Sequence, residues 1–126
     1  MPEEVYPVRP VLLVDDEQEL VSTLAERLSM RGIDADWVSS GEEALKQVEN
    51  KFYDLAVLDV KMPKLGGIKL KQILDDKYPT MKFIFLTGHG SESDFQQGTS
   101  EFGVTDYLVK PVRIEVLIEK IKAAMK

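Results

Sequence analysis

Acidic, hydroxyl and amine side chains directly follow short apolar runs in this sequence. The residues at these positions are Asp15, Asp16 and Glu17 after the first run, Asp59 after the next central one, then Thr87, and finally Lys110 before Pro111. Carboxylates placed close together repel one another, and burying them is costly unless a cation or hydrogen-bond donors accompany them. These residue types therefore indicate a site that binds a cation.

Magnesium is the cation that fits these side chains best. Mg²⁺ prefers oxygen ligands and is commonly held by one or two carboxylates together with the phosphate oxygens of a substrate. Asp15, Asp16 and Asp59 offer such oxygens, whereas the sequence has no cysteine and one histidine, which argues against zinc. We therefore expect these aspartates to form a Mg²⁺ site.

With a metal in place, the same positions supply the groups needed for phosphoryl transfer. The reaction requires a nucleophile, neutralisation of the phosphoryl oxygens and positioning, and an aspartate carboxylate can be the nucleophile. Asp59 is the candidate nucleophile because it stands alone at the end of a central apolar run. Lys110 could contact the phosphoryl oxygens through its ammonium and Thr87 through its hydroxyl.

The apolar runs predict buried β-strands, because they contain β-branched residues and are too short for helices. The five predicted strands are Val11–Val14, Ala35–Val38, Leu55–Leu58, Phe83–Leu86 and Thr105–Val109. The second and the fifth are assigned mainly from their regular placement between helical segments.

Helical patterns separate these runs. Apolar residues at helical spacing predict helices through Leu20–Leu28, Ala44–Val48, Ile68–Leu74 and Ile114–Ile121, and a polar helix is expected at Ser91–Glu101. Ser40 followed by Glu43 is typical of a capping box that opens the second helix, and Gly32 should end the first. The third helix should end near Tyr78, before Pro79.

Strand and helix alternate five times, which predicts an α/β fold with a doubly wound parallel sheet and five helices on its two faces. We expect the flavodoxin-like strand order 2-1-3-4-5. In such a sheet the loops at the carboxyl ends of the strands form the functional edge. The candidate residues should therefore meet at one edge of the sheet.

Length and composition limit the remaining possibilities. A chain of 126 residues with 44% hydrophobic content can form one domain, here 1–126 with residues 1–8 as an N-terminal extension. With 22 acidic and 16 basic residues the net charge is −6, so we expect no direct binding to nucleic acid or to anionic membranes. No apolar stretch approaches a membrane span or a secretion signal, which favours a cytoplasmic protein.

Taken together, these motifs resemble the receiver domains of bacterial two-component response regulators over essentially the whole chain. The matching positions are Asp15-Asp16 as the family's acidic pair, Asp59 before Met62-Pro63 and Gly67 as its phosphoacceptor, Thr87 as its switch hydroxyl, Lys110-Pro111 as its invariant lysine followed by a cis peptide, and Tyr107 as its switch aromatic. Several such elements in the right order are far more specific than any one of them.

The resemblance implies a phosphodonor and a metal site. A histidine kinase or a histidine phosphotransfer protein would donate the phosphoryl group to Asp59. The backbone carbonyl of Lys61 would join Asp16 and Asp59 around Mg²⁺, and Asp15 would act mainly through water. Lys61 and His89 would flank the site and could tune the lifetime of the acyl phosphate.

The resemblance also implies a conformational switch. Phosphorylation would draw Thr87 toward the phosphate and turn Tyr107 inward, although Tyr107 could also be an ordinary half-buried strand aromatic. The surface of the fourth helix, fifth strand and fifth helix would then control a partner or an output domain, or form a phosphorylation-dependent dimer. The protein would be no enzyme beyond its own phosphorylation and dephosphorylation.

Two other classes of function remain as alternatives. A Mg²⁺-dependent aspartyl-phosphate phosphatase of the haloacid dehalogenase type would carry an Asp-x-Asp pair after the first strand, whereas here Asp15 is followed directly by Asp16, and no cap segment is present. A flavodoxin-like binding module, or a degenerate receiver used as a scaffold, would not need all three aspartates.

Overall fold

The computed structural model describes residues 10–88 and 106–125 of the chain. Its strands form one parallel sheet with the order β2-β1-β3-β4-β5. The strands are β1 (Val11–Val14), β2 (Ala35–Val38), β3 (Leu55–Asp59), β4 (Lys82–Thr87) and β5 (Asp106–Val109). The predicted fold class and strand order are confirmed.

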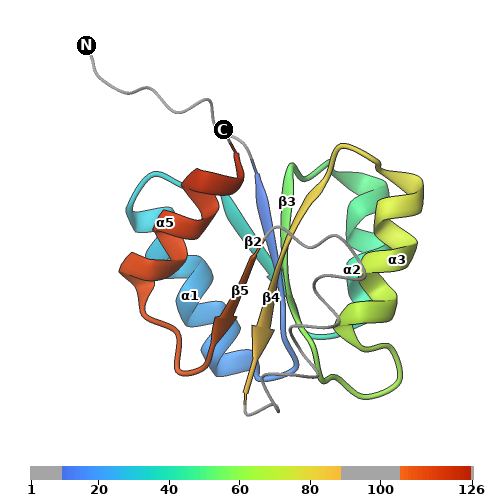
Figure 1. Cartoon of the computed structure of the whole chain (residues 1–126), viewed down its shortest axis with the longest axis horizontal. Coiled ribbons are helices and arrows are strands. Elements are labelled where there is room, and N and C mark those ends of the chain that lie inside the picture. Colours follow the sequence, from blue (N-terminus) through green and yellow to red (C-terminus); the bar gives the residue numbers. More distant parts are fainter. Residues whose placement is uncertain (1–9, 89–105, 126) are drawn as a thin grey trace.

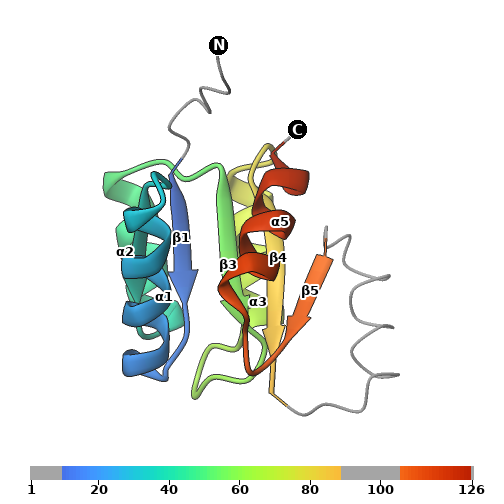
Figure 2. The same cartoon turned by 90° about the vertical axis from the view of Figure 1, so that its left-hand side faces the viewer.

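Helices cover both faces of this sheet (Figures 1 and 2). They are α1 (Gln18–Met30), α2 (Gly41–Asn50), α3 (Gly67–Lys77) and α5 (Ile114–Ala124). In Figure 1, α1 and α5 lie on one side of the sheet, and α2 and α3 lie on the other. The predicted polar helix Ser91–Glu101 lies outside the described residues. None of the described helices combines the length and the apolar character needed to cross a bilayer.

The central strands are buried on both faces, as a parallel sheet covered by helices requires. Every residue of β1 and β3 is buried. Side chains alternate between the faces, so that Leu13 and Val57 belong to the core under α1 and α5, whereas Leu12 and Leu58 belong to the core under α2 and α3. Two apolar cores therefore fix the positions of the strand ends.

Two strands extend further than predicted, and both extensions reach candidate site residues. β3 includes Asp59, which pairs with Leu86 on β4. β4 includes Thr87, which pairs with Val109 on β5. Asp59 and Thr87 are thus the last residues of regular strands, and the sheet itself holds their backbones in place.

The start of α2 differs from the predicted capping box by one residue. Ser40 is the N-cap, and its Oγ accepts a hydrogen bond from the backbone N–H of Glu43 at 3.1 Å. The carboxylate of Glu43 accepts the reciprocal bond from the backbone N–H of Ser39 at 2.8 Å, instead of from that of Ser40. The pair still satisfies two backbone donors and secures the loop after β2.

Edge strand β2 is fastened by a polar network that the sequence pattern did not reveal. The Tyr53 hydroxyl donates a hydrogen bond to Asp36 at 2.6 Å and accepts one from Gln47 at 2.7 Å. Lys51 forms an ion pair with Asp36 at 3.0 Å. Burial, reinforced by the hydrogen bond to Asp36, raises the pKa of Tyr53 to about 12. The hydroxyl therefore stays protonated and remains a donor.

The apolar stripe of α3 also differs from the prediction at one position. Lys71 is buried together with Leu70 and Leu74, while Ile73 is half-buried. The Lys71 ammonium lies 5.7 Å from the centre of the Phe83 ring, an arrangement in which cation and ring attract each other. The methylene chain of a lysine can pack like an apolar side chain while its charge reaches a polar partner.

Gly67 connects the packing of α3 to the end of β3. Its backbone N–H donates to the carbonyl of Val60 at 3.1 Å. A methyl group in place of its hydrogen would clash with the backbone carbonyl of Asp59. Only glycine allows α3 to begin this close to Asp59.

We expect Gly67→Ala to lower the free energy of unfolding by about 1–3 kcal/mol, because the backbone at Asp59 must shift to admit the methyl group. Urea denaturation measures this change. Gly88→Ala is the control, since a Cβ there meets no atom of the described residues within 4 Å. Equal stability of the two variants would contradict the close packing at Asp59.

Candidate functional site at the carboxyl edge of the sheet

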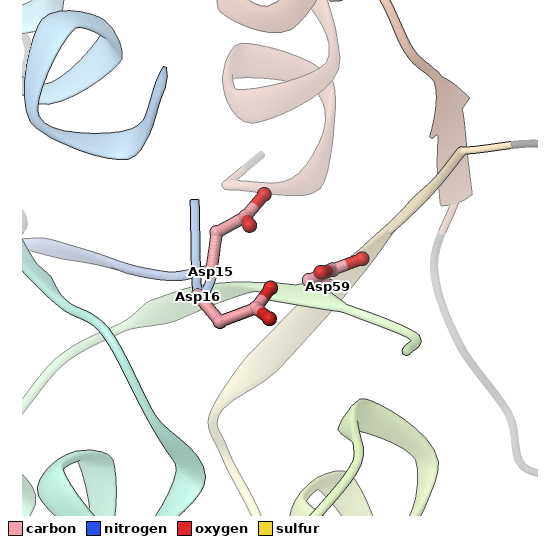
Figure 3. Close-up of side chains that lie close together, drawn as sticks. All are labelled: Asp15, Asp16 and Asp59. Atoms are coloured by element: carbon pink, nitrogen blue, oxygen red, sulfur yellow. The ribbon is translucent and has the colours of Figure 1, made fainter. Parts of the chain in front are cut away.

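The candidate residues gather where the parallel strands end. Asp15 directly follows β1, Asp59 ends β3, Thr87 ends β4 and Lys110 directly follows β5. Figure 3 shows the carboxylates of Asp15, Asp16 and Asp59 close together beside these strand ends. The sheet topology therefore brings together side chains that are far apart in the sequence.

Backbone hydrogen bonds continue the sheet into the site. Asp15 N–H donates to the Val38 carbonyl at 3.3 Å, and Lys110 N–H donates to the Thr87 carbonyl at 2.8 Å. The residue after Asp59, Val60, donates to the Leu86 carbonyl at 2.9 Å. Neighbouring strands thus limit the movement of the residues that carry the functional side chains.

The carboxylate oxygens of the three aspartates lie close enough together to hold one metal ion. One carboxylate oxygen from each of Asp15, Asp16 and Asp59 lies within 4.8 Å of the others. This span is close to the roughly 4.2 Å that separates opposite ligands of one Mg²⁺ ion, given metal–oxygen distances of about 2.1 Å. Asp15 and Asp59 are buried, whereas Asp16 is exposed at the mouth of the site.

One oxygen in this cluster lacks a hydrogen bond. Asp15 Oδ2 is buried and, within the described part of the chain, has no partner in hydrogen-bond geometry. Lys110 Nζ lies 2.8 Å away from it and contributes an ion pair. The ammonium supplies a counter-charge but is not aligned as a hydrogen-bond donor, and a metal-bound water could supply one. The residues therefore fit a bound Mg²⁺.

Lys110 stands among three carboxylates. Its Nζ is 2.8 Å from Asp15 Oδ2, 2.6 Å from Glu17 Oε1 and 3.6 Å from Asp59 Oδ2. Burial lowers the pKa of this ammonium, but the pairing with Asp15 and Glu17 outweighs that effect and holds the pKa above its ordinary value. Lys110 is therefore charged at every physiological pH.

The Asp59 carboxyl has a strongly altered acidity. Burial, followed by repulsion from Asp15, raises the pKa of Asp59 to about 7 in the metal-free protein. The charge of Lys110 and a hydrogen bond from the backbone of Lys61 act in the opposite direction. Asp59 is thus a buried carboxylate that needs additional positive charge to be fully ionised at neutral pH.

The remaining predicted residues occupy different parts of the site. Thr87 is buried, with 8% of its surface exposed, and Tyr107 is half-buried against the core on the side of α2 and α3. The Lys110–Pro111 peptide is cis, as the resemblance implied. Lys61 is exposed, and His89 lies outside the described residues.

Glu17 is part of the site but had no assigned role in the sequence interpretation. Its backbone N–H donates to Asp15 Oδ1 at 2.9 Å, and its carboxylate contacts Lys110. The only sequence signal was its position directly after the acidic pair, which is equally common for an exposed residue at a helix start. The ion pair joins positions 93 residues apart, so local patterns could not reveal it.

The chain is thus a doubly wound α/β domain with a cluster of three aspartates at its carboxyl edge that could hold a metal ion. A family model described as the response regulator receiver domain matches residues 11–122. The chain therefore belongs to the response regulator receiver family and is a phosphorylation-activated signalling switch. Such domains serve signalling and are not conventional enzymes.

Curated relatives agree with this family. PhoP, the alkaline phosphatase synthesis transcriptional regulatory protein of Bacillus subtilis, is 36% identical over 118 residues, covering 94% of this chain and 49% of PhoP. The transcriptional regulatory protein CpxR of Escherichia coli is 40% identical over 116 residues, covering 92% of this chain and 49% of CpxR. The chain spans about half the length of the curated relatives it matches.

Solved structures show the same fold. A CheY-like response regulator receiver domain protein from Methanospirillum hungatei superposes with a TM-score of 0.85 at 30% identity, covering 93% of both chains. A response regulator receiver domain protein from Clostridium thermocellum has a TM-score of 0.84 at 30% identity, covering 93% of this chain and 94% of the other.

The raised pKa of Asp59 leads to a prediction for the metal-free protein. Because the pKa of Asp59 is higher in the folded protein than in the unfolded chain, the folded protein binds more protons between these two pKa values. The free energy of unfolding therefore falls as the pH rises from about 4 to about 7. We expect Asp59→Asn to raise the free energy of unfolding in EDTA at pH 8 by more than about 1 kcal/mol, the equivalent of a single pKa unit. The gain should shrink steadily toward pH 4.

Thermal or urea unfolding across this pH range measures the effect. Asp76→Asn is the matched control, because Asp76 is an exposed acid on α3. Its substitution should change stability by less than about 0.5 kcal/mol at either pH. A gain for Asp59→Asn that does not depend on pH would contradict the assigned acidity.

Proposed function

We propose that Asp59 accepts a phosphoryl group from the phosphohistidine of a histidine kinase or a histidine phosphotransfer protein. The reaction would require Mg²⁺ held by Asp15, Asp16, Asp59 and the backbone carbonyl of Lys61. The observation that carries this proposal is the buried Asp59 carboxylate, whose pKa is raised to about 7 beside two further aspartates. Clustered carboxylates with too little positive charge nearby favour the binding of a divalent cation. Mg²⁺ bound there can also accept phosphoryl oxygens as ligands.

The residues of the chain would act in one displacement step. An Asp59 carboxylate oxygen forms a bond to phosphorus while the phosphorus–nitrogen bond of the donor breaks, and the leaving imidazole takes up a proton from water. The Lys110 ammonium and the Thr87 hydroxyl donate hydrogen bonds to the phosphoryl oxygens. Mg²⁺, when bound, neutralises further charge on those oxygens. Asp15 and Asp16 would help to hold the cation, Asp15 mainly through water.

The readout would be a change in population between two conformations. Thr87 would move toward the phosphoryl group and Tyr107 would turn inward, altering the surface of the fourth helix, β5 and α5. Phosphorylation can shift this equilibrium only by stabilising one conformation more than the other. On this surface Val109 already exposes 48% of its area on β5, which suits contact with a partner, an output domain or a second copy.

The relatives bear on what the switch controls. PhoP and CpxR are named as transcriptional regulatory proteins, and this chain matches about half of each. We therefore propose that residues 1–126, as one receiver domain in the cytoplasm, regulate a separate output domain or partner. The net charge of −6 disfavours direct contact of this part with nucleic acid.

The proposal is tested by phosphorylation with a small donor. The protein is incubated with acetyl phosphate or phosphoramidate and Mg²⁺, and intact mass and peptide mapping locate the adduct. We expect one phosphoryl group on Asp59, absent after Asp59→Asn and in the presence of EDTA. An adduct on another residue, or sustained turnover of a small phosphoester, would contradict the proposed role of Asp59.

The residues that flank the site should set the lifetime of the phosphorylated state. Lys61 and His89 stand two positions after Asp59 and Thr87, respectively. We expect Lys61→Ala or His89→Ala to change the half-life of the aspartyl phosphate several-fold, because these side chains would flank the phosphoryl group. Loss of the adduct over time, followed by mass spectrometry, measures this rate. Unchanged half-lives in both variants would refute it.

A further inference from the structure

We propose that Glu17 is a positioning residue, which holds the Lys110 ammonium away from Asp59 until a phosphoryl group reaches the site. This role rests on the function proposed above, because it concerns the availability of Lys110 for phosphoryl transfer. Glu17 itself would contact neither the metal nor the phosphoryl group.

The geometry of Lys110 supports this role. Its Nζ lies 2.6 Å from Glu17 Oε1 but 3.6 Å from Asp59 Oδ2. The shorter distance is that of a charge-assisted hydrogen bond, whereas the longer one is not a hydrogen bond. In the unphosphorylated protein the ammonium is therefore paired with Glu17 and with Asp15, and it makes no hydrogen bond to Asp59.

Glu17 can keep this position because its backbone is tied to the site. The Glu17 N–H donates to Asp15 Oδ1 at 2.9 Å, and its carbonyl accepts from the Val21 N–H at 3.0 Å in the first turn of α1. The side chain, in contrast, is 62% exposed. A fixed backbone with a solvated carboxylate gives a contact that forms readily and breaks readily.

The two close partners of Lys110 differ in how easily they release it. The Asp15 side chain is fully buried, and an ion pair whose partner is buried is costly to break. The exposed Glu17 pair contributes no more than about 1 kcal/mol, because water replaces the lysine at little cost. When phosphoryl oxygens arrive, Lys110 should therefore leave Glu17 and remain paired with Asp15.

Two consequences follow for Glu17→Gln. In this variant no carboxylate of residue 17 attracts Lys110, so the ammonium should lie closer to Asp59. Phosphorylation by acetyl phosphate should then become about two- to fivefold faster, which corresponds to the free energy of one exposed ion pair. The same inward position of Lys110 opposes the metal. Without any phosphodonor, the Mg²⁺ dissociation constant should therefore rise about two- to fivefold.

A matched variant separates this role from the general effect of charge. Glu19→Gln removes the same charge from the first turn of α1, and Glu19 is exposed and is not among the described carboxylates within ion-pair distance of Lys110. The effects of Glu17→Gln should exceed those of Glu19→Gln for both the phosphorylation rate and the Mg²⁺ affinity.

A double-mutant cycle tests whether Glu17 acts through Lys110. Calorimetric Mg²⁺ titration is repeated for Glu17→Gln and Glu19→Gln in the Lys110→Met background, where no phosphorylation is needed for the readout. We expect the difference between the two variants to disappear there, since the ammonium that Glu17 positions is gone.

The possible results are distinct. Equal rates and equal Mg²⁺ affinities for Glu17→Gln and Glu19→Gln would overturn the role of Glu17, as would a difference that persists with Lys110→Met. If the wild-type protein is phosphorylated on Asp59 in these experiments, the proposed function stands whatever the result for Glu17. If it acquires no adduct on Asp59, the proposed function fails, and the role of Glu17 fails with it.

Discussion

The site depends on two buried carboxylates, Asp15 and Asp59, that the sheet holds side by side. Burial and mutual repulsion raise the pKa of Asp59 to about 7, even with the Lys110 ammonium 3.6 Å away. The two carboxylates could reduce their repulsion by moving apart only if strands that are buried on both faces moved as well. Lys110 offsets this repulsion only in part, and we propose that a bound cation supplies the remaining positive charge.

The packing around the site explains why the two carboxylates cannot move apart to reduce their repulsion. Every residue of β1 and β3 is buried between two apolar cores, and α3 begins directly against the Asp59 carbonyl at Gly67. These contacts fix the backbone, whereas the charged side chains at the mouth, Asp16 and Glu17, are exposed and free to respond. A rigid sheet edge with solvated acidic residues around it can change its charge without losing its fold.

Local sequence patterns predicted most of the fold and the gathering of the candidate residues at one edge of the sheet. The apolar runs located the strands, and the rule that parallel strands share one functional edge placed Asp59 near Lys110. Contacts that depend on three-dimensional neighbours could not be predicted. Lys71 is buried with its ammonium near the Phe83 ring and Asp75, and Glu17 reaches Lys110 across 93 residues of sequence. Neither lysine nor glutamate carries a local signal for such a contact.

A crystal structure with Mg²⁺ and beryllofluoride, an analogue of a phosphoryl group, would test the central claim most directly. The account predicts the analogue bonded to an Asp59 oxygen, with Mg²⁺ contacting Asp16, Asp59 and the Lys61 carbonyl, and with Lys110 on a fluorine atom. A site that stays empty at saturating Mg²⁺ and beryllofluoride, or an analogue bound away from Asp59, would contradict it.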